Sequence, residues 1–492
     1  MKKIVKRLSL LMALLMLLSA VTLLGSCKKS NDTDDTESTT VSTVTPGEGE
    51  INYRGYLPEA TFDGKEIIIY TTYEQIDQLR LDPDKPDRSN FDRAIYARNV
   101  EIEEKYDVVL DWAWETTHDR NKYATVCNQA GAYEYDIMAA AYWWGLEQQG
   151  GYVNLLDYDV LNFENPYWVT YWNQSATVND KCFTALGYWS MTPVSKSCVV
   201  YYNKQIVKDM QFDDPAALVE SGDWTLANMK ELMIKNTFEV DGDGVSTYSD
   251  SYGLGYNLWS GRAFLWGAGL KLSNFDNNEV EFTLRTAHNT DVFDAVYSFL
   301  KDGGYAYYRG NDDLKYDIAT DNDIGLFTNG RSLFFSHNLL YAENIATSGK
   351  LKDYGVLPMP KLDTNQEDYI TPITGGINFA IFMQSPDIEA AATIMEAMCI
   401  LSYCDVLPVY YEDTLKLRYQ TDAEAAEMID LIRSKINVDF LFINDAQFNN
   451  VCNAPFDLIA KGDTNFEGEM QSRLAQMPTL LEKFMQVYTA TE

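Results

Sequence analysis

The run Glu66-Ile67-Ile68-Ile69-Tyr70, just after the turn dipeptide Asp63-Gly64, is the first strong structural signal in this chain. Consecutive β-branched residues without polar alternation are typical of a strand that is covered on both faces. Such strands occur mainly in parallel sheets that have helices packed on each side. The run therefore predicts an α/β fold class.

The residues that follow place a helix between further strands. A helix is expected from Asn90, because Phe91 and Ile95 are spaced to share one face. Strands are expected at 108–110 and at 135–141, where short apolar runs recur. Alternation of strand and helix implies parallel strands joined by helical crossovers.

The second half of the chain alternates in the same way. Val199-Val200-Tyr201-Tyr202 predicts a strand, and later strands are expected at 354–358 and 377–382. Thr225 is suited to cap one helix, and Ser385-Pro386 to begin another that is rich in alanine. The mature chain exceeds 450 residues, so two α/β lobes are expected.

The N-terminus has the pattern of an export signal. Four basic residues precede an apolar run that ends in Leu24-Gly25-Ser26-Cys27, which is similar to a bacterial lipobox. We expect residues 1–27 to be a lipoprotein signal peptide, Cys27 to be the lipidated residue, and 28–60 to be a disordered tether rich in Ser, Thr and Asp. The alternative is an ordinary transmembrane anchor, since the apolar run is nearly long enough to span a bilayer. The predicted location is the extracellular face of the cell membrane.

The net charge limits the classes of partner that the protein is expected to bind. The 492-residue chain has 73 acidic and 39 basic residues and a net charge of −34, and loss of residues 1–27 would remove four basic side chains and make it −38. Such a body repels nucleic acid and anionic lipid headgroups, so its partners should be neutral or cationic. Six cysteines follow Cys27, but their pairing is left open because six permit fifteen arrangements.

Signals of catalysis are few. The chain has three histidines, none with a metal-type partner four residues on, and it lacks a nucleophile elbow, a P-loop and a dinucleotide fingerprint. Carboxylate pairs remain open as acid–base groups, because so acidic a chain offers many of them. We expect no enzyme activity and no required cofactor.

One acidic loop has the spacing of a calcium site. Oxygen-bearing groups recur at regular loop positions around a glycine that permits the sharp turn, and the expected ligands are Glu239, Asp241, Asp243, Val245 through its carbonyl, Thr247 and Asp250. Glu at the first position and Asp at the last depart from the usual pattern. The loop is therefore either a structural calcium site or a solvated acidic turn.

Several short segments then occur in a characteristic order. They are Tyr135-Asp136-Ile137, 150–155, Val200-Tyr201-Tyr202-Asn203-Lys204, Asp223-Trp224-Thr225-Leu226, 327–334, 354–360 and 375–381. Each is weak alone, but together they resemble the extracellular solute-binding proteins of ABC sugar-uptake systems, the family that includes maltose-binding proteins.

The resemblance implies a two-lobed periplasmic-binding-protein-like fold, with strands that cross a hinge and an interlobe ligand cleft. The first lobe would comprise residues 61–165 plus about 370–430, and the second 166–369 plus about 431–492. It also implies a monomer that closes around a small-molecule solute and delivers it to ABC permease subunits.

Ligand-binding residues are expected where strands end, because loops meet ligands at that edge of an α/β sheet. The candidates are Tyr73, Glu74, Tyr142, Trp143, Trp144, Tyr202, Trp259, Arg262, Trp266, His337, Gly375, Gly376 and Asn378. Tyr202 also matches an aromatic that stacks on sugar in the maltose-binding branch, whereas Ile377 stands where the family often has Trp. For each aromatic the alternative is core packing, and for His337 a structural role.

The function expected from these observations is capture of a carbohydrate, an oligosaccharide in particular, by a lipid-anchored binding protein. Two alternatives stay open: a secreted carbohydrate-active enzyme, and a surface protein that presents its ligand to a sensor.

Overall fold

The computed structural model describes residues 51–72, 78–80, 89–115, 126–127, 129–141, 151–240, 242–244, 247–276, 278–308, 322–412 and 423–489. Within these, Tyr53–Glu492 belong to one compact unit. Several predicted site residues lie outside the described residues: Cys27, Tyr73, Glu74, Tyr142, Trp143, Trp144, Asp241 and Val245.

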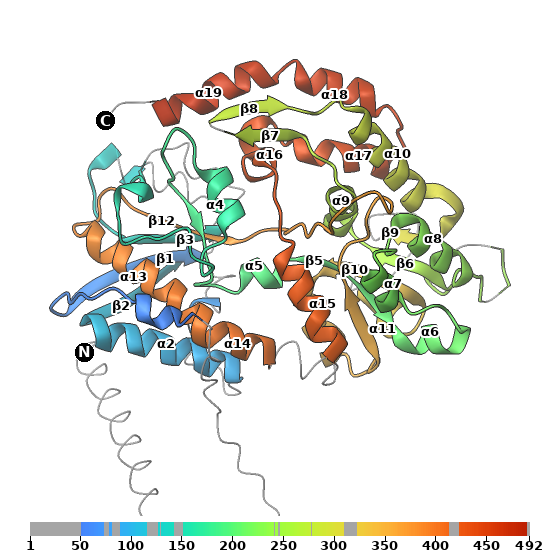
Figure 1. Cartoon of the computed structure of the whole chain (residues 1–492), viewed down its shortest axis with the longest axis horizontal. Coiled ribbons are helices and arrows are strands. Elements are labelled where there is room, and N and C mark those ends of the chain that lie inside the picture. The colour runs from blue at the N-terminus through green and yellow to red at the C-terminus, as the bar shows by residue number, and fades with distance from the viewer. Residues whose placement is uncertain are drawn as a thin grey trace, which may run out of the picture. The chain divides into compact units, whose positions relative to one another are not determined.

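The first sheet has the strand order β2-β1-β3-β12-β4 (Figure 1). Its strands are β1 Lys65–Thr72, β2 Val108–Glu115, β3 Ile137–Ala141, β4 Ala185–Leu186 and β12 Ile377–Ile381. β1 is parallel to both β2 and β3, whereas β12 is antiparallel to β3 and β4. The α/β fold class predicted from the Ile-rich run is thus confirmed.

Asp136, which directly precedes the central strand β3, links several segments of the first lobe. Asp136 accepts hydrogen bonds from the Ile68 N–H at 2.8 Å and the Tyr133 hydroxyl at 3.0 Å, and it also binds Ser385. The predicted helix is α2 (Asn90–Tyr106), and Ser89 begins it with a capping box. Asp136, which belongs to one of the segments that resemble the solute-binding family, therefore also has a structural role.

The second sheet has the order β11-β5-β10-β6-β9 (Figure 1). Its strands are β5 Cys198–Asn203, β6 Tyr252–Tyr256, β9 Ala306–Tyr308, β10 Ser332–Asn338 and β11 Tyr354–Leu357. β10 is parallel to β6 and antiparallel to β5, and β6 is parallel to β9. A separate hairpin is formed by β7 Ser273–Asp276 and β8 Glu279–Phe282.

Two motif residues have structural roles in the second sheet. Trp224 is buried, and its indole N–H donates to the Pro358 carbonyl at 2.9 Å. Thr225 caps the next helix by accepting from the Asn228 N–H, as predicted. A Cβ on Gly355 would lie 2.1 Å from the ring of Tyr202, so glycine there permits close packing.

Helices cover both sheets. The longer ones are α8 Leu226–Lys235, α9 Leu258–Gly267, α10 Ala287–Lys301, α13 Ile388–Leu401, α15 Ala423–Ser434, α17 Ala454–Lys461, α18 Phe466–Leu474 and α19 Met477–Thr489. The shorter ones are η1 Tyr53–Tyr56, η5 Leu155–Asp157, α4 Thr170–Ala176, α5 Thr192–Ser195, α6 Lys204–Met210, α7 Pro215–Ser221, η6 Asp302–Gly304, α11 Asn322–Thr328, η7 Leu339–Tyr341, α12 Ala342–Thr347, η8 Ser402–Val406, α14 Leu407–Val409, α16 Phe440–Ile443, η10 Asp445–Phe448 and η11 Val451–Asn453.

One helical stretch, Ile388–Glu412, is long and apolar enough to cross a membrane, with a mean hydropathy of 1.5. However, 83% of its apolar window is buried inside the protein. Its composition is therefore that of a core helix packed against the first sheet.

Two lobes result, one around each sheet, and neighbouring chain segments cross between them. The Thr374 N–H donates to the Lys196 carbonyl at 2.9 Å, and the Thr371 N–H donates to Lys435 at 2.8 Å. The first crossing lies later than the expected boundary at 165, because β4 still pairs with β12 in the first sheet. The chain enters the second sheet only after α5.

Candidate functional site

Helix α9 begins directly after β6 and is fixed by its cap. The Asn257 side chain accepts hydrogen bonds from the N–H groups of Trp259 and Ser260, and the Ser260 hydroxyl accepts from the Asn257 N–H at 3.0 Å. This reciprocal capping box fixes the start of α9 directly after β6.

One face of α9 carries Trp259, Arg262, Ala263 and Trp266, spaced three, four and seven residues apart. Such spacing places side chains on one side of a helix, and the two indoles are separated by roughly 10 Å of helix rise. All four line a cavity of about 350 Å³.

The opposite side of α9 is held by a close approach. A Cβ on Gly261 would lie 2.1 Å from the ring of Phe456 in α17. Glycine therefore allows α17 to pack against α9, which sets the position of the cavity face.

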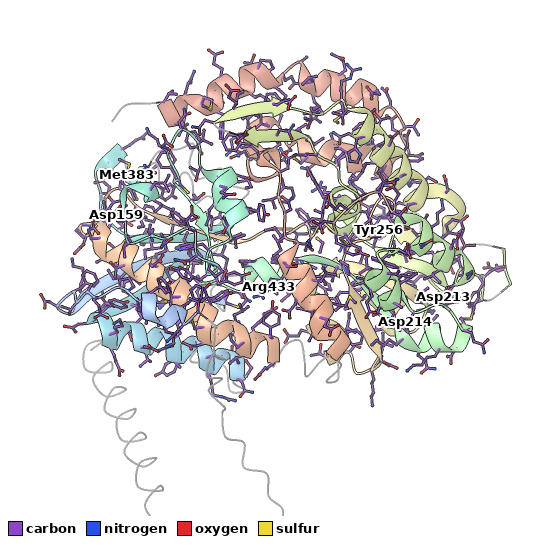
Figure 2. All side chains as sticks on the ribbon, in the orientation of Figure 1. Asp159, Asp213, Asp214, Tyr256, Met383 and Arg433 are labelled. Carbon is purple, nitrogen blue, oxygen red and sulfur yellow. The ribbon has the colours of Figure 1, made fainter. Side chains whose placement is uncertain are left out.

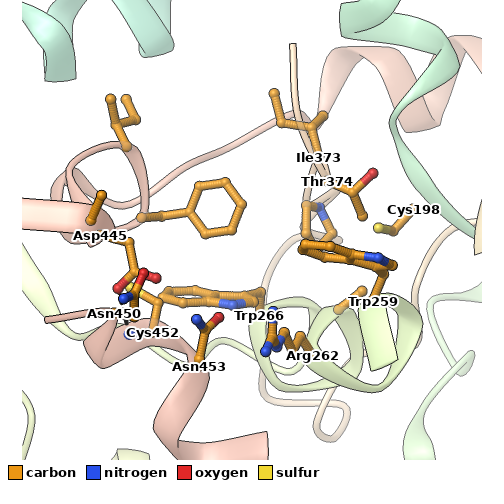
Figure 3. A pocket seen from close by; sticks show the side chains of 15 residues that line it. Cys198, Trp259, Arg262, Trp266, Ile373, Thr374, Asp445, Asn450, Cys452 and Asn453 are labelled. Carbon is orange, nitrogen blue, oxygen red and sulfur yellow. Dashed lines mark hydrogen bonds between the residues drawn. The ribbon is translucent and has the colours of Figure 1, made fainter. Parts of the chain in front are cut away.

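The cavity is assembled from four parts of the chain (Figure 3): α9, Cys198 at the start of β5, the crossing segment near residue 373, and the region from α16 to η11. Its lining residues are Cys198, Trp259, Arg262, Ala263, Trp266, Pro372, Ile373, Thr374, Phe442, Ile443, Asp445, Ala446, Asn450, Cys452 and Asn453.

Aromatic rings form one apolar surface of the cavity. Trp259 is 45% exposed, while Trp266 is 8% exposed and meets the ring of Phe442 edge-on at 5.5 Å. Figure 3 shows the two indoles side by side along α9, with Arg262 near Trp259. The Arg262 guanidinium lies 5.2 Å from the centre of the Trp259 ring and 3.7 Å from Asp457.

The other surfaces are partly polar. Asp445 accepts a hydrogen bond from the Cys452 backbone N–H at 2.8 Å, and burial raises the pKa of this carboxyl to about 6. Thr374 on the crossing segment accepts a hydrogen bond from Asn338 at 3.3 Å. A cavity with flat apolar rings and a few polar groups suits a ligand with apolar faces and polar edges.

The thiols of the cavity are not nucleophiles. Burial raises the pKa of Cys198 to about 12 and that of Cys452 well above its usual value, so both remain protonated at neutral pH. All six described cysteines are free.

Of the predicted ligand-binding residues that the structure describes, Trp259, Arg262 and Trp266 come together in this cavity. Tyr202 is buried in the core, with its hydroxyl 3.4 Å from Asp214. His337 is buried, stacks on Tyr341, and accepts a hydrogen bond from the Asn338 N–H at 2.8 Å. Neither Tyr202 nor His337 lines the cavity.

Asn378 lies near the start of β12, and Gly375 and Gly376 directly precede that strand. Gly375 is buried, and a Cβ on Gly376 would lie 2.8 Å from Leu186. Asn378 is 2% exposed, and its side-chain oxygen has no hydrogen-bond partner within the described residues. Asn378 therefore belongs to the first sheet, and none of these three residues lines the cavity.

Most of the lining residues that sequence reasoning missed come from one C-terminal region, and the others are Cys198, Ala263, Pro372, Ile373 and Thr374. Phe442, Asp445, Asn450 and Asn453 follow no periodic pattern, and long-range folding brings them to α9. An aromatic residue among Asp and Asn in 442–453 was the only local signal.

The acidic loop is partly described. The N–H groups of Val240 and Thr247 donate to Asp250 at 2.9 and 2.7 Å and lower the pKa of its carboxyl. Glu239 accepts from the Gly244 N–H, and Asp243 is exposed. Among the described residues, no group of three His, Cys, Asp or Glu side chains is arranged to hold a metal. The calcium site stays a prediction.

The arrangement defines a class: two α/β lobes, joined by crossing segments, with a cavity beside the crossing. It is the two-lobed periplasmic-binding-protein fold. No protein-family model and no curated protein matches the sequence.

Solved structures match the fold at low sequence identity. The GacH receptor of Streptomyces glaucescens, solved unliganded and with acarbose, is 14% identical with a TM-score of 0.55, over 85% of this chain and 99% of that chain. A cyclic α-maltosyl-1,6-maltose binding protein from Arthrobacter globiformis is 12% identical with a TM-score of 0.57, over 85% and 99%. An ABC transporter solute binding protein from Thermotoga lettingae, bound with α-D-tagatose, is 15% identical with a TM-score of 0.54, over 85% and 100%.

Proposed function

We propose that this chain is the substrate-binding protein of an ABC importer and that it captures a carbohydrate, an oligosaccharide in particular. The observation that carries the proposal is the pair of indoles, Trp259 and Trp266, on one face of α9 inside a cavity beside the lobe crossing. The similar structures named above bind acarbose, a cyclic maltosyl-maltose and tagatose, which supports a sugar-like ligand.

The mechanism is capture without chemistry. The indoles cover the apolar faces of sugar rings, while Asp445, Asn450 and Asn453 exchange hydrogen bonds with hydroxyl groups. Movement of the lobes about the crossing segments then encloses the ligand, and the closed form is presented to the permease.

Hydrolysis fits this cavity less well. A glycoside hydrolase needs two carboxylates that flank the scissile bond. Asp445 is the one carboxylate among the described residues that line the cavity. This favours binding over catalysis.

The remaining parts of the proposal concern the N-terminal segment and the acidic loop. Cys27 would carry the lipid that holds the protein at the extracellular face of the membrane, and residues 28–60 would let it reach the permease. The loop at 239–250 would bind calcium in a structural role. A Cys27→Ser variant tests the anchor, since it should be released from the cell surface.

Calorimetric titration of the full chain with malto- and cello-oligosaccharides tests ligand capture. Trp259→Ala removes an exposed ring, so we expect about tenfold or greater loss of affinity with little change in stability. Tyr171→Ala is the matched control, because Tyr171 is 59% exposed and lies outside the cavity lining. Equal loss in both variants, or no binding by the parent chain, would contradict the proposal.

A further inference from the structure

The carboxylate at one end of the cavity has few partners. Figure 3 shows Asp445 near Trp266, and its described donors are the backbone N–H and the thiol of Cys452. A carboxylate accepts about four hydrogen bonds, so capacity remains for a ligand. Asp439, a second half-buried carboxylate, also acts on Cys452 and adds to the negative charge here.

Two cations act on this carboxylate, and each of them also forms an ion pair with another carboxylate. Arg262 and Arg473 are the positive charges that act on Asp445. Arg262 lies 3.7 Å from Asp457, and Arg473 donates to Glu469 at 2.8 Å. Asp445 itself makes no ion pair within the described part of the chain, so Arg262, which also lines the cavity, and Arg473 compensate its charge only in part.

A carboxylate that has no ion pair and lies beside aromatic rings attracts a particular kind of ligand. Trp266 and Phe442 meet at this end, and an ammonium group near an aromatic ring gains cation–π energy in addition to its pairing with a carboxylate. The net charge of −34 also draws cations toward the protein.

We propose that the solute of this cavity is a glycan bearing a basic amine, an amino-sugar unit whose ammonium group pairs with Asp445. The proposal rests on the proposed function of glycan capture and names the class of glycan. It predicts a preference for an amine over a hydroxyl at one position of the ligand.

The test compares maltotriose and cellotriose with their 6-amino-6-deoxy counterparts, by calorimetric titration of the full chain in about 0.15 M salt near pH 7.5. We expect the amine forms to bind about tenfold tighter or more. The preference should fall several-fold near pH 5, because burial raises the pKa of Asp445 to about 6 while the amine of the ligand stays protonated.

Asp445→Asn should abolish the preference for the amine. The matched control is Asp213→Asn, which removes the same charge from an exposed site of the second lobe between α6 and α7 (Figure 2) and should leave the preference unchanged.

Three results would overturn the inference. Equal affinity for amine and hydroxyl forms, or a preference that survives in Asp445→Asn, would overturn the inference alone. In both cases binding of the neutral sugars would still support glycan capture. Failure of every neutral and amine form to bind would overturn the proposed function together with the inference.

Discussion

Two charged side chains, the buried Arg98 in the first lobe and the half-buried Asp445 in the second, have opposite surroundings. Arg98 is 2% exposed and donates through all of its N–H groups: to the carbonyls of Leu79 and Trp189, to Ser402, and to Asn99. Asp445 receives hydrogen bonds only from Cys452 within the described residues.

The difference separates a structural charge from one available to a ligand. Neither group has an ion-pair partner in the described part of the chain, and burial shifts the pKa of both: that of Arg98 falls to about 9, and that of Asp445 rises to about 6. A buried charge with every hydrogen bond made fixes the fold, whereas one with spare capacity beside a cavity is costly until a ligand fills it.

Truncation of Arg98 should have the largest effect. Arg98→Ala removes five hydrogen bonds from this buried site and leaves the Leu79 carbonyl with Asn99 and the Trp189 carbonyl with Ser402 as their remaining donors, so we expect about 3–5 kcal/mol lower stability in urea unfolding. Arg98→Lys should recover little, because an ammonium cannot reproduce the planar fork. The control is the exposed Arg93→Ala on the same helix, expected within about 0.5 kcal/mol of the parent. A small effect of Arg98→Ala would remove the distinction between the two charges.

Neutralising the cavity charge should do the reverse and stabilise the protein. The pKa of Asp445 is about 6 in the folded protein and near 3.8 when unfolded, so the carboxyl favours the folded state when protonated and loses that contribution as the pH rises through about 6. Asp445→Asn should therefore raise stability near pH 7.5 by at most about 3 kcal/mol, with no gain near pH 4. Thermal unfolding across this range measures the effect, and a gain that is independent of pH would contradict the assigned cause.

Local patterns predicted the scaffold well but only part of the cavity. The Ile-rich run lies within β1, Thr225 caps α8, and the α9 residues share a face because helical spacing is local. Asp445 and Phe442 could not be predicted, since tertiary packing alone brings them to α9. Tyr202 is the opposite case, because a motif marked it as a ligand-binding candidate and the structure places it in the core. Its place in the motif reflects packing against Gly355.

A methyl group at Gly261 should disturb the cavity but leave the Arg98 site intact. Its Cβ would lie 2.1 Å from the Phe456 ring, so α9 and α17 must separate, at a cost of about 1–3 kcal/mol. We expect Gly261→Ala to weaken glycan binding more than it lowers stability, because Trp259 and Trp266 move with α9. Gly55→Ala is the control, since open space surrounds its Cβ. Unchanged affinity in Gly261→Ala would show that α17 does not set the cavity.

Calcium should have the smallest effect on stability, because the Asp250 carboxylate, like the Arg98 guanidinium and unlike Asp445, already has several hydrogen-bond donors or acceptors around it. Its carboxylate already accepts from the N–H groups of Val240 and Thr247, so a metal ion must compete with bonds that are made. We expect millimolar calcium to raise stability by only about 1 kcal/mol relative to chelator, measured by thermal unfolding. Asp243→Asn should remove this gain, because its exposed carboxylate is a predicted ligand, while Asp213→Asn should keep it. An equal calcium response in both variants would place the ion elsewhere and leave the loop an acidic turn held by its own backbone.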